Sequence, residues 1–139
     1  MLQTFEFEGA LDQCQAVLEI DPDHLGALEV MAQAQWQAGQ FEEVITTTSR
    51  LLRLNPHEPG YRYTRGMALM SRGELFRAAE DFKRAISQSD DMRFKTQVAG
   101  ALDAVEMWIE EQSLRPRREE NAKHFPRPKL QSDLVGRYH

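Results

Sequence analysis

The sequence predicts an all-α protein in which antiparallel helix pairs repeat along the chain and stack into a solenoid. Three observations predict this fold. Shifting the sequence by 34 residues places similar residues over one another, and a fixed period of this length is typical of repeat proteins. Apolar residues within each unit recur at the i, i+3, i+4, i+7 spacing of one helix face. Glycine and proline mark turns at matching places in successive units.

Five columns of matching residues carry the repeat, and each column falls on the second helix of a unit. They are Phe7, Phe41 and Leu75; Ala10, Val44 and Ala78; Leu11, Ile45 and Ala79; Val17, Leu51 and Ala85; and Leu18, Leu52 and Ile86. One helix pair cannot bury its apolar face alone. We therefore expect the units to stack on one another.

The individual elements follow from this register. Gly39 and Gly73 separate paired helices, where a residue that tolerates positive φ ends one helix and reverses the chain. Pro22 and Pro56 disfavour a helical conformation at the residue before them and close their units. We predict a single helix in the first unit, two helix pairs after it, and a long final helix that stops before Pro116. The predicted ranges are 6–20, 24–38, 41–54, 58–72, 75–88 and about 91–114.

Composition places the chain among globular proteins. Its 139 residues are 41% hydrophobic and 28% charged, which fits one domain with a modest core. No apolar run approaches the length of a bilayer, and the N-terminal residues lack the pattern of a secretory signal. The single cysteine, Cys14, cannot form an internal disulfide. These features predict a cytoplasmic protein without membrane insertion.

Charge is distributed unevenly along the chain. Residues 1–112 carry a net charge of −9, whereas residues 113–139 carry +4. Proteins that bind nucleic acid draw their affinity from clustered lysine and arginine. The acidic body therefore argues against nucleic acid as a partner.

A known repeat signature matches the third unit. Gly66 lies at the small-residue position of the first helix, and Ala78, Phe82 and Ala85 follow in the second helix. This pattern resembles the tetratricopeptide repeat, whose signature is a large residue, Leu-Gly and Tyr in the first helix, then Ala, an aromatic residue and Ala, closed by proline. The resemblance covers roughly residues 6–112.

The other units match this family in part. Residues 25–58 agree at Leu28 and Pro56, and residues 7–22 agree at Ala10, Val17 and Pro22. The departures are Ala32 for the usual glycine, Val44 for alanine, Thr48 and Cys14 in the aromatic column, Arg62 at the large-residue position and Asp90 in place of proline.

The resemblance implies a short right-handed superhelical solenoid within a domain of residues 1–114. Its parts are a half repeat over residues 6–22, repeats over 25–58 and 59–92, and a capping helix over about 91–114. Residues 115–139 form a basic, proline-containing tail, which we expect to be extended or disordered.

In this family the first helices line a concave groove that usually binds peptides. By register, twelve residues are predicted to line that groove: Glu29, Val30, Gln33, Trp36, Gln37, Tyr63, Thr64, Met67, Met70, Phe94, Gln97 and Val98. Aromatic and methionine side chains favour burial of a partner side chain or helix. An alternative is that Met67 and Phe94 complete the packing between helices.

Some family members hold acidic C-terminal peptides through a clamp of cationic residues on these faces. The matching positions here are Glu29, Gln33, Thr64, Gln97 and Ala101. None is cationic, so the sequence argues against that clamp.

Catalytic, cofactor-binding and metal-binding patterns are absent from the sequence. His24, His57, His124 and His139 are isolated from one another, and there is no phosphate-binding loop or nucleophile motif. We expect no enzyme activity and no cofactor.

The sequence thus predicts a protein-interaction module of the adaptor, scaffold or chaperone-like kind. One alternative is a regulatory or assembly segment of a larger enzyme. Another is a homo-oligomer, formed through the tail or through Phe7, Leu11 and Cys14, because the first unit supplies no first helix to cover them.

Overall fold

The protein forms six helices, seen in a computed structural model that describes residues 4–114, with side chains from Glu8 onward. No strand occurs within this range, and the predicted all-α repeat fold is confirmed. The predicted tail, residues 115–139, lies outside the described residues. The helices are α1 Thr4–Ile20, α2 Leu25–Gln37, α3 Phe41–Leu54, α4 Pro59–Ser71, α5 Leu75–Gln88 and α6 Met92–Leu114.

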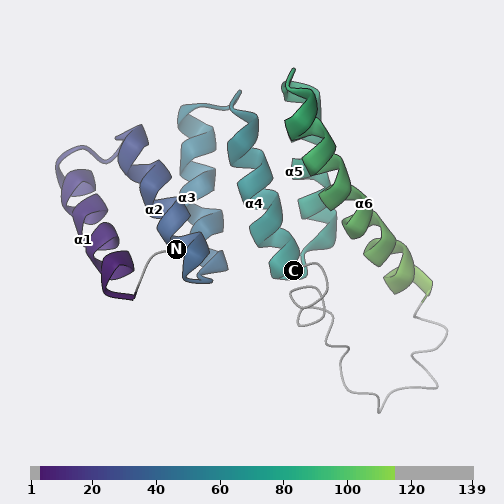
Figure 1. The fold of residues 1–139 in the computed structure, drawn as a ribbon, viewed down its shortest axis with the longest axis horizontal. Helices are drawn as coiled ribbons and strands as arrows, with labels where there is room; N and C mark the ends of the chain where they lie inside the picture. Colours follow the sequence, from purple (N-terminus) through teal and green to yellow (C-terminus); the bar gives the residue numbers. More distant parts are fainter. Residues whose placement is uncertain (1–3, 115–139) are drawn as a thin grey trace, which may run out of the picture.

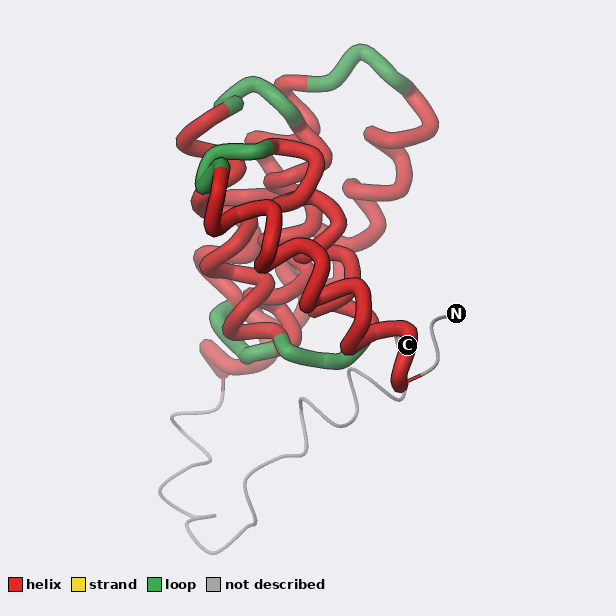
Figure 2. Tube along the Cα trace, turned by 90° about the vertical axis from the view of Figure 1, so that its left-hand side faces the viewer, coloured by secondary structure: helices red, strands yellow, loops and turns green. Residues whose placement is uncertain are grey.

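The helices follow one another across the molecule in chain order, from α1 at one end to α6 at the other (Figure 1). Each helix packs mainly against its neighbours in the sequence, and α4 also contacts α6. A view along the row shows the chain running back and forth between loops at the two ends of the helices (Figure 2). Stability in such an array comes from contacts between neighbouring units.

The two predicted glycine turns adopt the same geometry. Gly39 has φ of 75° and Gly73 has φ of 82°, in the left-handed region that favours glycine. The Gly39 amide donates to the Trp36 carbonyl at 3.0 Å, and the Gln40 amide donates to the Gln35 carbonyl at 2.9 Å. The turn after α4 repeats both bonds. This pattern satisfies the last carbonyl groups of α2 and α4 and reverses the chain.

Side chains also cap the helix starts. The Ala27 amide donates to Nδ1 of His24 at 3.0 Å, so this histidine caps α2. At the start of α6, the Arg93 amide donates to the Asp91 carboxylate at 3.0 Å. These acceptors satisfy amides that have no partner inside the helix.

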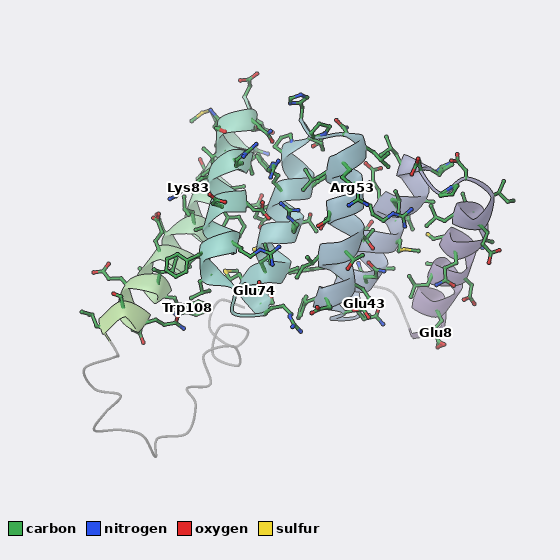
Figure 3. All side chains as sticks on the ribbon, turned by 180° about the vertical axis from the view of Figure 1, so that it is seen from behind. Glu8, Glu43, Arg53, Glu74, Lys83 and Trp108 are labelled. Carbon is green, nitrogen blue, oxygen red and sulfur yellow. The ribbon has the colours of Figure 1, made fainter. Side chains whose placement is uncertain are left out.

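The larger apolar core lies between α4, α5 and α6. Phe82 is fully buried there, and its ring lies against Gly66. A Cβ atom on Gly66 would come within 2.5 Å of that ring, so the glycine is required by the close approach of the two helices. Trp108 anchors the lower part of α6 and is 5% exposed (Figure 3). A smaller core lies between α2, α3 and α4 and consists of Leu28, Ala32, Leu51, Leu52 and Tyr61.

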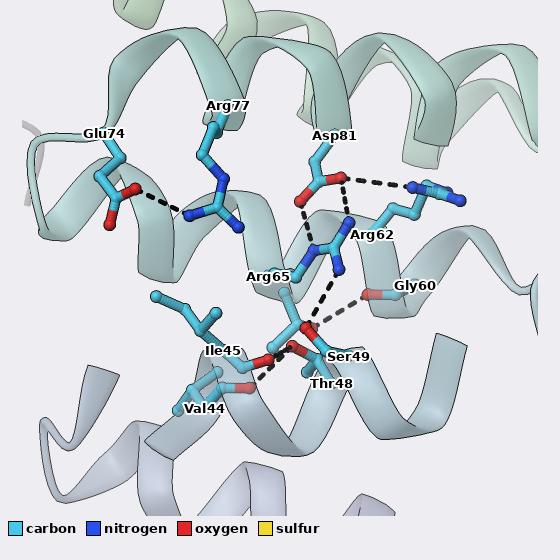
Figure 4. A network of polar contacts seen from close by, with 11 residues as sticks. Val44, Ile45, Thr48, Ser49, Gly60, Arg62, Arg65, Glu74, Arg77 and Asp81 are labelled. Carbon is cyan, nitrogen blue, oxygen red and sulfur yellow. Dashed lines mark hydrogen bonds and ion pairs between the residues drawn. The ribbon is translucent and has the colours of Figure 1, made fainter. Parts of the chain in front are cut away.

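A network of polar contacts connects α3, α4 and α5 (Figure 4). The Asp81 carboxylate on α5 accepts two hydrogen bonds from Arg65 on α4, at 2.8 and 2.9 Å. Arg62 approaches the same carboxylate at 3.4 Å, and Arg65 also donates to the Ser49 hydroxyl on α3 at 3.1 Å. Hydrogen bonding to Asp81 raises the pKa of Arg65. The network therefore ties three successive helices together.

Candidate functional site

A cavity of about 490 Å³ opens between α2, α3 and α4. Helices α2 and α4 supply its walls, and α3 supplies part of its floor. Its lining is mostly apolar and aromatic, with a few hydroxyl and amide groups. The lining residues are Glu29, Ala32, Gln33, Trp36, Thr48, Leu51, Gly60, Tyr61, Tyr63, Thr64 and Met67.

Helical periodicity brings the wall residues to one side of each helix. On α2, Glu29, Gln33 and Trp36 follow an i, i+4, i+7 spacing. Gly60, Thr64 and Met67 follow the same spacing on α4. Residues at this spacing lie on one face of a helix, so each of these two first helices presents one face to the cavity.

Small residues in the floor account for the opening. Ala32 and Thr48 are buried and line the cavity. Shifted by one repeat length, the same positions hold Gly66 and Phe82, where the phenylalanine ring fills the space above the glycine. Thr48 is too short to reach so far, and its hydroxyl donates to the Val44 carbonyl of its own helix at 2.7 Å. The space that Phe82 fills in one pair is therefore left open in the other.

One hydrogen bond joins the two walls. The Tyr61 hydroxyl on α4 donates to Oε2 of Glu29 on α2. Tyr61 is 9% exposed. Burial, and then the hydrogen bond to Glu29, raise the pKa of Tyr61 to about 12. The bond fixes the Glu29 carboxylate at the edge of the cavity, and Glu29 is the one charged residue of the lining.

Aromatic packing orients the rings at the two sides of the cavity. The Trp36 ring on α2 lies edge-on to Phe41, with ring centroids 5.2 Å apart. The Tyr63 ring on α4 packs edge-on against Phe94 at 5.8 Å, and the Gln97 amide donates to the Tyr63 hydroxyl at 3.2 Å. Trp36 and Tyr63 are both half-buried. Part of each ring is therefore exposed to the cavity, and the rest packs against neighbouring side chains.

Six of the residues predicted for the groove line this cavity: Glu29, Gln33, Trp36, Tyr63, Thr64 and Met67. Phe94 and Gln97 contact Tyr63 from α6. Val30 and Gln37 are exposed on α2 outside the cavity.

The structure corrects the placement of two predicted groove residues. Met70 is 5% exposed and Val98 is fully buried, and both belong to the core between α4, α5 and α6. The repeat register predicts the helix face that a residue occupies. It does not predict how closely the neighbouring helices pack against that face, and here Met70 on α4 and Val98 on α6 are both buried in the core that these two helices form with α5.

Besides Gly60 on α4, four lining residues lie outside the predicted set: Ala32, Thr48, Leu51 and Tyr61. Ala32, Thr48 and Leu51 form the floor, whereas the projection from the family register gave only wall residues. A signal was present in the sequence, because Ala32 and Thr48 are departures from the repeat signature. Together, Ala32 and Thr48 have a smaller side-chain volume than the glycine and aromatic residue usual at these positions. Such a loss of volume indicates a hollow in a repeat that is otherwise closely packed.

The residues predicted for self-association fall in different environments. Cys14 is 5% exposed, and burial raises the pKa of its thiol. It packs within the chain, so the expectation that it forms part of an uncovered surface is wrong. Leu11 is half-buried, and the Phe7 side chain lies outside the described residues.

No helix in the described range is long and apolar enough to cross a membrane. Among residues 4–114, no group of three or more His, Cys, Asp or Glu residues is placed to hold a metal ion.

A family model described as tetratricopeptide repeat matches residues 1–68, and the helix pairs and glycine turns continue that pattern beyond residue 68. The chain contains tetratricopeptide repeats. A search of curated protein sequences finds no match to this tetratricopeptide repeat chain.

Solved tetratricopeptide repeat structures share the fold. The Yersinia enterocolitica type III secretion translocator chaperone SycD superimposes with a TM-score of 0.71 at 20% identity, over 78% of this chain and 77% of that one. The tetratricopeptide repeat domain of P58(IPK) gives a TM-score of 0.75 at 20% identity, over 84% of this chain and 33% of that one.

An O-GlcNAc transferase from Thermobaculum terrenum gives a TM-score of 0.63 at 23% identity over 72% of this chain. The matched part is 19% of the transferase chain. At these identities the likenesses show the tetratricopeptide fold alone.

Proposed function

We propose that this tetratricopeptide repeat protein holds a peptide segment or an amphipathic helix of a partner protein in the cavity between α2 and α4. Its family makes it a protein-interaction module in general terms. The observation that carries the finer proposal is the open cavity itself, which two first helices and a shortened floor create.

The size and lining of the cavity support a peptide occupant. A volume of about 490 Å³ is in the range of protein binding pockets, and it is large enough for one or two side chains of a bound segment. Trp36 and Tyr63 are aromatic anchors of the kind that dominates binding energy at interfaces. Met67 is flexible and adapts to the shape of an apolar partner.

Peptide selection tests this proposal directly. A library of random 12-residue peptides displayed on phage would be selected against the full chain, and the affinities of the enriched peptides would be measured by fluorescence anisotropy. We expect Trp36→Glu and Met67→Glu to weaken binding at least tenfold, because each places a charge in an apolar contact. Circular dichroism would verify that each variant keeps its helices.

Val30→Glu is the matched control. Val30 lies on the same helix as Trp36 and is 48% exposed, but it does not line the cavity. The proposal fails if the two cavity variants bind the selected peptides as well as the Val30 variant does.

A second candidate function is self-association through α1. Val17 is 38% exposed and Ile20 is 88% exposed, whereas Leu51 and Ala85, which share the repeat position of Val17, are almost fully buried. Exposed apolar side chains on one helix favour contact with another copy. Sedimentation velocity over a dilution series tests this candidate, and a monomer at every concentration would contradict it.

A further inference from the structure

We infer that the cavity between α2 and α4 recognises a basic side chain, an arginine or a lysine, flanked by apolar residues in the bound peptide. This inference rests on the proposed function and specifies the chemistry of the partner. It follows from the charge, the aromatic walls and the depth of the cavity.

The charge of the lining has one sign. Glu29 is the single charged residue among the lining residues, and no lysine, arginine or histidine lines the cavity. Tyr61 donates to Oε2 of Glu29, while Oε1 makes no hydrogen bond within the described range. The carboxylate is thus held in place by one wall and keeps an acceptor for a cationic donor. An acidic ligand side chain would meet this carboxylate with no cation to offset the repulsion.

The aromatic walls suit the same ligand. Trp36 and Tyr63 approach the cavity from α2 and α4, and packing against Phe41 and Phe94 limits their motion. A guanidinium or ammonium group within about 6 Å of an aromatic ring centroid is attracted by the face of the ring. Arginine fits such a site well, because its planar group both stacks on rings and donates to a carboxylate.

The floor provides room for the apolar part of such a side chain. Ala32, Thr48 and Leu51 are buried beneath the walls. Arginine and lysine bury their aliphatic stems against apolar surface while the charged end stays near polar groups. With Glu29 exposed at the edge of the cavity, the charged end pairs at the rim and avoids the cost of full desolvation.

The net negative charge of the whole domain also favours basic peptides, at longer range than the contacts in the cavity. Residues 1–112 carry a net charge of −9. A field of this sign raises the rate at which basic peptides reach the surface.

The inference is tested by removing the charge first from the peptide and then from Glu29. The phage-selected peptide that binds the full chain most tightly would be synthesised with its arginine intact and with citrulline, which has nearly the same shape and no charge. A peptide selected with lysine would be compared with its acetyl-lysine form. We expect the neutral peptide to bind on the order of tenfold more weakly, as expected for loss of a charge-assisted hydrogen bond and a cation–π contact.

Glu29→Gln supplies the second arm. Glutamine keeps an oxygen that can accept from Tyr61, so the wall contact is retained while the charge is removed. We expect this variant to bind the charged peptide more weakly and to keep only the smaller part of the preference, which the aromatic rings supply. Glu43→Gln is the matched control: it removes the same charge from an exposed position outside the cavity, on the face seen in Figure 3. It should keep the tenfold preference.

The outcomes separate the inference from the proposed function. Selected peptides without a basic residue, or a tenfold preference that Glu29→Gln leaves undiminished, would overturn the inference. If Trp36→Glu still abolishes binding in that case, the peptide-binding groove stands without a basic ligand. If Trp36→Glu and Met67→Glu leave binding unchanged, the proposed function itself falls.

Discussion

At the scale of single residues, the difference between a filled and an open helix pair rests on two positions. Gly66 and Phe82 interlock in the third unit, whereas Ala32 and Thr48 hold the same positions one repeat earlier. Interiors are packed closely enough that such a difference in side-chain size has a structural consequence. In this protein the consequence is a cavity that reaches the surface.

The contact between Gly66 and Phe82 leads to a stability prediction. Gly66→Ala would bring a methyl group within 2.5 Å of the ring, and overpacking of this kind costs about 1–3 kcal/mol. Gly100→Ala is the matched change in α6, where nothing lies within 4 Å of the added atom. It should stabilise the protein by about 0.5–1 kcal/mol, because alanine is the better helix former. Urea unfolding of both variants measures the difference, and shifts of the same sign would contradict the account.

Tyr61 gives the protein a predicted sensitivity to alkaline pH. Its pKa is raised from 10.0 to about 12 in the folded state, so the unfolded chain loses the phenolic proton first as the pH rises. The contribution of Tyr61 to stability is therefore fully present below pH 10.0 and is lost as the pH rises through about 12. Wild type should lose stability relative to Tyr61→Phe across this range, as measured by denaturant unfolding at a series of pH values. Parallel curves would show that the pKa is not raised.

At the scale of the elements, the polar network between α3, α4 and α5 is the least ordinary feature. Asp81 has a side-chain exposure of 5%, and its arginine partners have exposures of 14% and 20%. Two arginines thus depend on one buried carboxylate. Removing one partner from a buried ion pair leaves an uncompensated charge.

Asp81→Ala is accordingly predicted to destabilise the protein by about 3–5 kcal/mol. The comparison is Glu74→Ala, which removes the partner of Arg77 from an exposed pair and should cost about 1 kcal/mol or less. Thermal and urea unfolding of both variants would measure these values. A loss after Asp81→Ala no greater than after Glu74→Ala would mean that the network contributes little.

Sequence reasoning predicted the helices well and the polar network not at all. The observed α3 and α5 have the bounds that periodicity predicted, and α1 begins two residues earlier than predicted. Periodicity succeeds because each helix carries its own apolar stripe and its own turn residues. The burial of Arg62 and Arg65 depends on how α3 and α5 pack against α4, and the apolar periodicity within one helix does not predict that packing.

The candidate site shows the same limit. The walls follow from the spacing of Glu29, Gln33 and Trp36, which sequence alone provides. The placement of Met70 and Val98 failed because both side chains are buried in the core between α4, α5 and α6. The exposure of a helix face depends on how the neighbouring helices pack against it. The repeat register therefore predicts which face a residue occupies, and only the structure shows whether that face is exposed.

At the scale of the whole molecule, contacts between neighbouring helices set a gradient of stability. Helix α1 packs mainly against α2, whereas α4 and α5 contact helices on both sides and share the larger core. Local opening is easiest where buried contacts are few.

Hydrogen exchange followed by mass spectrometry would measure this gradient. We expect the strongest protection in α4 and α5 and the weakest in α1 among the described helices. Peptides from α1 and α5 that exchange at equal rates would indicate that the array unfolds as one unit.

Peptide binding by a variant whose cavity is filled would show whether the cavity between α2 and α4 is the binding site. Ala32→Gly together with Thr48→Phe copies the packing of Gly66 and Phe82 into the preceding repeat. We expect this double variant to keep its helical circular dichroism spectrum and its thermal stability while its affinity for the phage-selected peptides falls at least tenfold. A well-folded double variant that binds those peptides with unchanged affinity would contradict the claim that the cavity between α2 and α4 is the binding site.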